Sequence, residues 1–258
     1  MSHDSSLIKP ALGDRPAAPG TGGEGVLLAG FQLERHTDGS LIQLLRQRLA
    51  SRVSTALFFA NTNLVVTGQG LLPQLRHETA AVVVNDGLGI DIGMAMRGHP
   101  KFAQNLNGTD FIPLLLTEVP GLRVFLYGGQ RLSVEGTARR IEAMGHQVVG
   151  CFDGYDSQEA EVVEAIGRTR PDVILVALGN PRQEAWILDH MASLPPAVLV
   201  GVGALFDFMS GRMPRAPRWV RRLRMEWLYR LYREPRRLAR RYTVDFVRFL
   251  VLCLWPAR

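Results

Sequence analysis

From Gly25 onward the chain alternates short, continuous apolar runs with stretches in which apolar residues recur every three or four positions. Continuous Val, Ile and Leu runs bounded by Gly or Pro are typical of strands buried on both faces, and the three-to-four spacing is typical of helices. The predicted strands are 26–31, 56–61, 81–85, 123–128, 147–152, 172–178 and 197–203. The predicted helices are 40–49, 64–76, 108–118, 133–144, 157–168 and 182–191.

This alternation predicts the fold class. Strands that alternate with helices favour an α/β fold, here a Rossmann-like, mostly parallel sheet flanked by helices and built from right-handed crossovers. We assign residues 25–211 to this core. Residues 1–24 are rich in Pro, Gly and Ser and lack the apolar segment of a signal peptide, so they are predicted to be a disordered leader. Residues 212–258 are predicted to form a basic, helical appendage.

Several predicted strands end in small residues next to a carboxylate or an amide. Because ligands of parallel α/β sheets bind at the carboxyl ends of the strands, six such ends at one edge predict a binding cleft. These ends contain Asn61, Asp86, Gly128 with Gly129, Asp153 with Gly154, 179–184 and 201–208.

Charge is distributed unevenly along the chain. The net charge is +6, yet the residues from Arg212 onward hold 14 arginines and three acids, which gives them +11 and leaves −5 for the rest. Within this segment Val220, Leu223, Trp227 and Leu231 fall on one face of a predicted helix. Basic, aromatic, amphipathic helices bind anionic membrane interfaces, so we expect this segment to contact such a surface. A solvated helix that packs on the core is the alternative.

The stretch AAVVVNDGLGIDIG (80–93) is open to three interpretations. Gly87, Gly89 and Gly93 form a GxGxxxG pattern after a strand, which is close to the fingerprint of an NAD(P)-binding oxidoreductase. Asp86 counts against that interpretation, because its carboxylate would lie beside the pyrophosphate. Asp86 is then either a cap for the following helix or a catalytic carboxylate.

Other catalytic signatures are missing from the sequence. It has no Walker A loop, no HExxH, no GxSxG and no Asp-x-Asp pair of the kind that holds a divalent metal in many sugar-nucleotide enzymes. The six histidines have no ligand spacing, so no metal ligand is predicted. Cys151 and Cys253 form no CxxC pair and are expected to be free thiols.

The longer motifs together resemble one family. They are NDGLGIDIG (85–93), FAQNLNGTDF (102–111), VFLYGG (124–129), GCFDGY (150–155), LGNPRQEAWI (178–187), GVGALFDFMSGRMPRAPRW (201–219) and EWLYRLYREPRRLARRY (226–242). This sequence resembles the WecG/TagA/CpsF glycosyltransferases (glycosyltransferase family 26) over nearly the whole chain after Gly25. NDGLG and NLNGTDF look most like the branch that contains the xanthan β-1,4-glucosyltransferase.

The resemblance implies an inverting hexosyltransferase that needs no metal or other cofactor. It would move a sugar from a UDP-sugar donor to a polyprenyl-diphosphate-linked glycan in bacterial exopolysaccharide or cell-surface polysaccharide synthesis. The enzyme would be cytoplasmic and peripheral on the inner face of the inner membrane. Asp86 matches the proposed catalytic base, Gln183 a substrate-contacting glutamine, and Asn61 the asparagine that ends the second strand.

Two positions depart from the teichoic-acid branch of this family. Phe59 stands where those members have Thr, and Asn105 stands where they have Arg. Both positions fall in the presumed sugar site, so the resemblance favours a donor other than N-acetylmannosamine.

The remaining candidates concern the nucleotide and the substrate. Backbone N–H groups at Gly128 and Gly129, or at 201–203, and the guanidinium groups of Arg215 and Arg230 are candidates for stabilising the departing diphosphate. Asp153 or Asp207 would hold the ribose or the uracil, or cap a helix. Asn85 and Asn105 are predicted to bind substrate. A nucleic-acid partner is not expected, because the acidic core would have no role, and self-association is left open.

Overall fold

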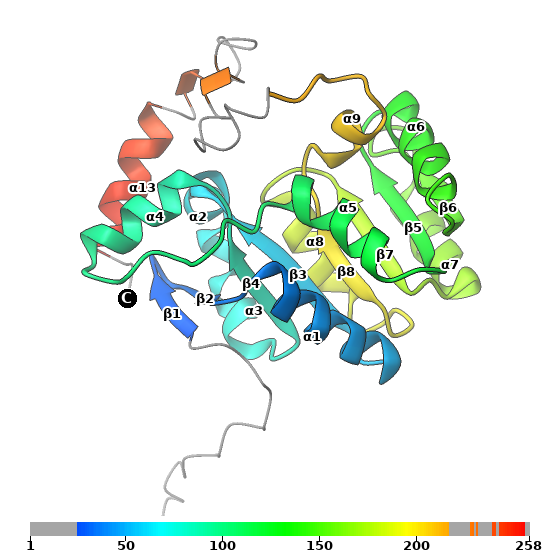
Figure 1. Cartoon of the computed structure of the whole chain (residues 1–258), viewed down its shortest axis with the longest axis horizontal. Helices are drawn as coiled ribbons and strands as arrows, with labels where there is room; N and C mark the ends of the chain where they lie inside the picture. Colours follow the sequence, from blue (N-terminus) through cyan, green and yellow to red (C-terminus); the bar gives the residue numbers. More distant parts are fainter. Residues whose placement is uncertain (1–24, 217–227, 230, 232–238, 241–242, 256–258) are drawn as a thin grey trace, which may run out of the picture.

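The computed structural model describes residues 25–216, 228–229, 231, 239–240 and 243–255 (Figure 1). The predicted leader (1–24), Arg230 and most of the arginine-rich segment lie outside the described residues.

A six-stranded parallel sheet forms the centre of the fold (Figure 1). Its strands pair in the order β4-β3-β8-β7-β5-β6, and each pairing is parallel. The bounds are Thr55–Ala60 (β3), Ala81–Asn85 (β4), Arg123–Gly128 (β5), Gln147–Phe152 (β6), Val173–Ala177 (β7) and Val198–Gly201 (β8). Every residue of β3, β7 and β8 is buried, as their continuous apolar sequences predict. The predicted α/β class is confirmed.

The prediction that residues 26–31 form one strand of this sheet is wrong. The chain instead forms an antiparallel hairpin of β1 (Gly25–Leu28) and β2 (Phe31–Glu34). Ala29 and Gly30, which join the two strands, have φ values of 49° and 89°. Two left-handed residues in succession make the tight turn that matches the right-handed twist of a hairpin, so the apolar run reverses direction in its middle.

Helices cover both faces of the sheet. The buried residues of α1, α5, α6 and α9 share one apolar cluster, while those of α2, α3, α4, α7, α8 and α13 share the other with the hairpin. The bounds are Asp38–Ala50 (α1), Thr62–Thr67 (α2), Leu72–His77 (α3), Leu88–Met96 (α4), Gly108–Glu118 (α5), Arg131–Glu142 (α6), Glu159–Thr169 (α7), Arg182–His190 (α8), Leu205–Met209 (α9) and Val244–Leu254 (α13).

Two helical predictions needed correction. The single helix expected over 64–76 is α2, a short 3₁₀ helix (Gln69–Leu71) and α3. Gly68 ends α2 and Pro73 opens α3, and both residues favour helix ends over helix interiors. For α4 the sequence indicates a helix after Asp86 but no bounds, because its two glycines lower its helix propensity.

Those glycines serve the packing of α4. A Cβ added to Gly93 would lie 2.8 Å from the Cys253 sulfur and 2.9 Å from the Phe249 ring, both on α13. A Cβ added to Gly89 would clash with Thr62, the first residue of α2. The spacing that resembled a dinucleotide fingerprint therefore allows α4 to lie close to α2 and α13.

Helix α13 packs beside α2 and α4 (Figure 1). Phe249 is fully buried and Cys253 nearly so, in the same apolar cluster as the hairpin. Within the part of the chain that the structure describes, no helix is both long and apolar enough to cross a bilayer.

We expect Gly93→Ala to lower the free energy of unfolding by about 1–3 kcal/mol, because the added methyl group overpacks the contact between α4 and α13. Gly167→Ala in α7 is the matched control. A Cβ there meets nothing within 4 Å, so this variant gains helix propensity and up to about 1 kcal/mol. Urea denaturation of both variants measures the difference, and equal effects would contradict the packing role of Gly93.

Candidate active site

One cleft of about 790 Å³ opens at the carboxyl edge of the parallel sheet. Each of the six strands contributes to its wall through its last residue or the loop that follows, as predicted for these strand ends. Representative lining residues are Asn61 after β3, Asp86 after β4, Gly129 after β5, Tyr155 after β6, Gly179 after β7 and Gly203 after β8. The parallel direction of the strands places all six at the same edge.

Asp86 lies in the turn between β4 and α4. Its backbone N–H donates to the Ala60 carbonyl at 2.7 Å, which ties the turn to the neighbouring strand β3. The N-cap residue of α4 is Gly87, which has a φ of 92°, and no side chain caps this helix end. The cap interpretation of Asp86 is therefore not what the structure shows, and its carboxylate lines the cleft.

Asn61 connects the end of β3 with this carboxylate. Its Oδ1 accepts the N–H groups of Asn63 and Leu64 at 3.0 and 3.1 Å and so caps α2. Its Nδ2 donates to Asp86 Oδ2 at 3.4 Å. Because the cap occupies the amide oxygen, the amide nitrogen is the group that faces Asp86.

Asn85 and Asn105 stabilise the turn that contains Asp86 and are not part of the cleft wall. Asn85 is fully buried, and its Nδ2 donates to the Gln104 carbonyl at 2.8 Å. Asn105 Oδ1 accepts the N–H of Gly87. The loop before α5 thus holds the turn on both sides of Asp86, and substrate binding by either amide stays a prediction.

The glycine N–H groups expected to bind phosphate already have partners. Gly129 donates to the Ala177 carbonyl at 2.9 Å, and Gly203 donates to Gln183 Oε1 at 3.0 Å. Gly128 is required for a different reason, since a Cβ there would lie 2.6 Å from the backbone of Ala177. For Gly129 and Gly203, hydrogen bonds within the chain therefore already use the N–H donors of the predicted phosphate cradle.

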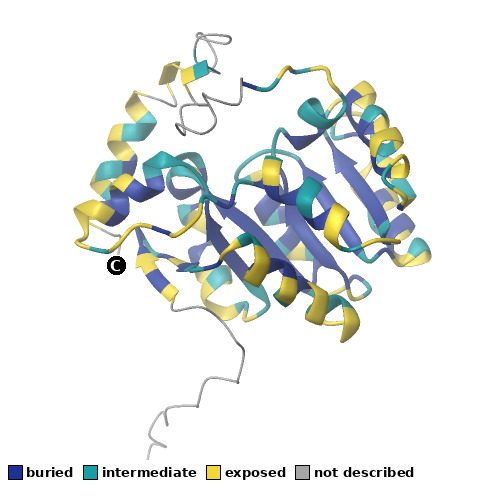
Figure 2. Cartoon of the chain, viewed as in Figure 1, coloured by how far each residue is buried: buried dark blue, intermediate teal, exposed yellow. Residues whose placement is uncertain are grey.

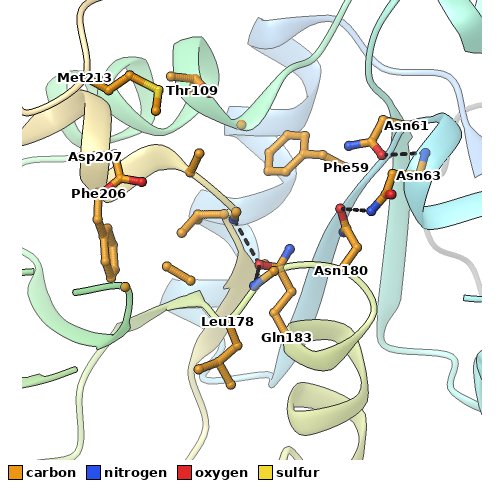
Figure 3. A pocket seen from close by; sticks show the side chains of 18 of the residues that line it. Phe59, Asn61, Asn63, Thr109, Leu178, Asn180, Gln183, Phe206, Asp207 and Met213 are labelled. Carbon is orange, nitrogen blue, oxygen red and sulfur yellow. Dashed lines mark hydrogen bonds between the residues drawn. The ribbon is translucent and has the colours of Figure 1, made fainter. Parts of the chain in front are cut away.

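Gln183 lines the cleft from the first turn of α8 (Figure 3). Its Oε1 accepts N–H groups from Gly179 and Gly203, and its Nε2 donates to Glu184 Oε1 at 2.7 Å. Glu184 is 1% exposed, and this burial raises the pKa of its carboxyl group above the ordinary value. Hydrogen bonds from Gln183 and Asn180 partly oppose the increase.

Asp207 and Asp153 have different places. Asp207 lines the cleft and accepts the Ser133 hydroxyl at 2.7 Å. Asp153 is buried beside the cleft, and hydrogen bonds from the backbone of Asp156 and Tyr155 hold its pKa below the ordinary value. Asp153 therefore shapes the turn that brings Tyr155 to the cleft.

Arg215 does not line the cleft. Its guanidinium pairs with Asp110 at the start of α5 and lies over the Phe208 ring. The cations in the described part of the cleft wall are instead Arg212 and Arg240, with Asp245 of α13 nearby on the same wall.

The sequence did not single out Asn63, Thr109 and Asn180, which also line the cleft (Figure 3). Asn63 Nδ2 donates to Asn180 Oδ1 at 3.4 Å, so the first turn of α2 and the loop after β7 meet through these side chains. Both residues lie just after a strand end, Asn63 in the first turn of α2 and Asn180 within the predicted strand end 179–184, and this position was the available signal.

Comparison with known proteins decides the family. Residues 26–258 match the model of the glycosyl transferase WecG/TagA/CpsF family. The chain belongs to this family.

Relatives within the WecG/TagA/CpsF family are N-acetylglucosaminyldiphosphoundecaprenol N-acetyl-beta-D-mannosaminyltransferases. That of Bacillus subtilis (strain 168) is 33% identical over 174 residues, which are 66% of this chain and 68% of the relative. That of Bacillus spizizenii (strain ATCC 23059 / NRRL B-14472 / W23) is 34% identical over 64% of this chain and 66% of the relative. That of Staphylococcus aureus (strain MW2) is 26% identical over 83% of this chain and 86% of the relative.

Family membership confirms that the protein is a glycosyltransferase. It leaves the NAD(P)-dependent oxidoreductase interpretation without support, since Gly89 and Gly93 are explained by helix packing. Among the described residues, no group of three or more His, Cys, Asp or Glu side chains is arranged to hold a metal ion. The sequence does contain one acid-x-acid pair that could be compared with a metal-binding motif, Glu159 and Glu161. These residues lie in the first turn of α7, where Glu159 pairs with His190.

Glu184 should make stability depend on pH. A carboxyl group with a raised folded-state pKa contributes stability below its ordinary pKa of about 4.5, and this contribution is lost as pH rises through the folded value. We therefore expect Glu184→Gln to be relatively more stable than the wild type at neutral pH than at pH 4.5. Urea denaturation across this range measures the effect, and parallel stability curves for the two proteins would contradict it.

Proposed function

We propose that this glycosyltransferase moves a sugar from a UDP-sugar to a polyprenyl-diphosphate-linked glycan, with inversion and without a metal ion. The observation that carries the proposal is Asp86, a carboxylate held at the cleft edge by bonds to β3 and to the loop before α5. The names of the relatives support a lipid-linked acceptor. The absence of an Asp-x-Asp pair supports a mechanism without a metal.

Asp86 would act as the general base. Inverting transfer requires one group to remove the proton of the acceptor hydroxyl while that oxygen attacks the anomeric carbon. The Asn61 amide, fixed by its capping bonds, would orient the carboxylate of Asp86 toward the acceptor hydroxyl. The same negative charge would favour the oxocarbenium-like transition state.

Arginines would stabilise the departing UDP. Because the N–H groups of Gly129 and Gly203 are bonded within the chain, the guanidinium groups of Arg212 and Arg240 are better placed to meet a diphosphate. Arg230 stays a candidate from the sequence, although it lies outside the described residues.

The donor sugar is proposed to differ from the N-acetylmannosamine of the relatives' names. Phe59 contributes an aromatic ring to the cleft wall and packs against Gly108 and Phe111 (Figure 3). This ring offers no hydrogen bond to an N-acetyl group, which favours a donor such as glucose and a product in exopolysaccharide synthesis. A panel of UDP-sugars, with UDP release as the readout, tests this choice.

A membrane surface is the proposed location of the acceptor. Val244, Val247, Val251 and Leu254 recur every three or four residues on α13 and are 46–59% exposed. Figure 2 shows exposed residues along the outer side of this helix. The stripe follows directly on the arginine-rich segment, so apolar insertion and attraction to anionic lipids would act at one place. The enzyme would then be peripheral on the inner face of the bacterial inner membrane.

We expect Asp86→Asn to lower kcat by about 10²–10⁴-fold while UDP binding is kept, because the amide preserves the shape but cannot accept the proton. Asp189→Asn, at an exposed position of α8, is the matched control. Turnover is measured by UDP release with a lipid-linked glycan in EDTA. Full turnover of Asp86→Asn would remove Asp86 as the base, and loss of wild-type activity in EDTA would overturn the metal-free mechanism.

Replacement of Val247 and Val251 by Glu should weaken binding to anionic vesicles about tenfold or more, because carboxylates would enter an apolar, negatively charged interface. Leu132→Glu, at a 62% exposed position on α6, is the control and should bind as the wild type does. Co-sedimentation with vesicles of phosphatidylglycerol and phosphatidylethanolamine measures the effect. Equal binding of all three proteins would place the contact elsewhere.

A further inference from the structure

Glu184 lies beneath the cleft and is not part of its wall. It belongs to the first turn of α8, is 1% exposed, and approaches the end of β8 at Gly201. A Cβ on Gly201 would lie 2.9 Å from Gln183 Nε2 and 3.3 Å from Glu184 Oε1. The chain therefore leaves room at this point for a carboxylate and an amide to meet under the strand.

The contacts of this carboxylate are unusual for a buried charge. Oε1 accepts two side-chain N–H groups, from Asn180 at 2.6 Å and from Gln183 at 2.7 Å. Oε2 has no hydrogen-bond partner among the described residues. No ion pair in that part of the chain includes Glu184, and no other charged side chain contributes to the shift of its pKa.

A carboxylate imposes a direction on the amides that it contacts. An ionised carboxylate only accepts hydrogen bonds, so both amides must turn their nitrogens toward Glu184. The oxygen of Gln183 then faces the N–H groups of Gly179 and Gly203, and the oxygen of Asn180 faces Asn63. Gln183 lines the cleft, and its Nε2 carries a second N–H besides the one donated to Glu184.

Further hydrogen bonds connect Asn180 to Asp86. Asn63 donates its side-chain N–H to Asn180 and its backbone N–H to Asn61, which in turn donates to Asp86. Figure 3 shows these amides along one wall of the cleft. A single chain of hydrogen bonds therefore joins the buried carboxylate to the carboxylate at the cleft edge.

Stability alone does not account for this arrangement. Removing a carboxylate from water is unfavourable, and an apolar residue of similar volume often stabilises a core at least as well. The positive end of α8 offsets part of this cost, because Glu184 lies in its first turn. An acceptor-only group at this point does give the two amides a single orientation, which an apolar residue would not.

We propose that Glu184 is a positioning residue: its carboxylate fixes the side-chain amides of Asn180 and Gln183, and Gln183 is the one of the two that meets the sugar substrate. This inference rests on the proposed glycosyl transfer. Glu184 touches no substrate itself and acts through Gln183.

Glu184→Gln tests this role because glutamine keeps the shape but carries a donor as well as an acceptor. Two orientations of the amides then compete, and we expect kcat/KM for the UDP-sugar to fall about tenfold while the protein stays folded. Glu164→Gln, the same chemical change at an exposed position of α7, should leave kcat/KM unchanged. Wild-type kcat/KM in Glu184→Gln would overturn the proposal.

A double-mutant cycle with Gln183→Ala separates positioning from a general loss of structure. If Glu184 acts through Gln183, adding Glu184→Gln to the Gln183→Ala protein should change kcat/KM less than twofold. Losses that multiply would show that Glu184 acts independently of Gln183 and would overturn the assigned route.

A readout that needs no turnover keeps the two proposals distinguishable. In ¹H–¹⁵N spectra of the full chain, the side-chain NH₂ signals of Asn180 and Gln183 should shift together as pH falls and Glu184 takes up a proton. They should not do so in Glu184→Gln. Inactivity with every UDP-sugar, with this coupled shift present, would overturn the proposed function alone. If the NH₂ signals of Asn180 and Gln183 do not shift with pH in the wild type, the proposed role of Glu184 is overturned.

Discussion

The common direction of six buried strands is the constraint on which the rest of the structure depends. Parallel strands require a crossover between each pair, and the crossovers place helices on both faces, so the carboxyl ends remain the open edge. Side chains separated by more than a hundred residues in the chain, such as Asn63 and Asn180, then lie within hydrogen-bonding distance. The cleft is a consequence of that shared direction.

Side-chain amides organise this edge more than glycine N–H groups do. Asn61, Asn85 and Asn105 fix the Asp86 turn from three sides, each by a bond to the backbone or to the carboxylate. Gln183 uses the backbone donors of two glycine-rich loops. The loops are therefore tied to one another before a substrate arrives, and this arrangement reduces the reorganisation that transfer of a sugar would need.

The C-terminal helix α13 links the cleft to the proposed membrane surface. Phe249 and Cys253 are buried against the core, where Gly93 allows close approach, while the valines on the other side stay exposed. Asp245, at the start of the same helix, reaches the cleft wall. One helix thus contacts the core, the cleft and the proposed lipid surface, so a lipid-linked acceptor would arrive on the side where Asp86 lies.

The sequence by itself determined the α/β class, most element positions and the meeting of six strand ends, because period and continuous burial are local properties that residues such as Val173–Ala177 record directly. The position of Asp86 after a strand left a cap or a catalytic carboxylate open, and the family resemblance gave it the role of base. Only the tertiary structure decided that the chain turns back at Ala29 to form a hairpin. It also decided that Asn85 and Asn105 stabilise the Asp86 turn and that Arg215 pairs with Asp110. The role of a polar side chain depends on which distant backbone or charged group satisfies it, and this partner is set by packing and not by the residue's own sequence neighbourhood.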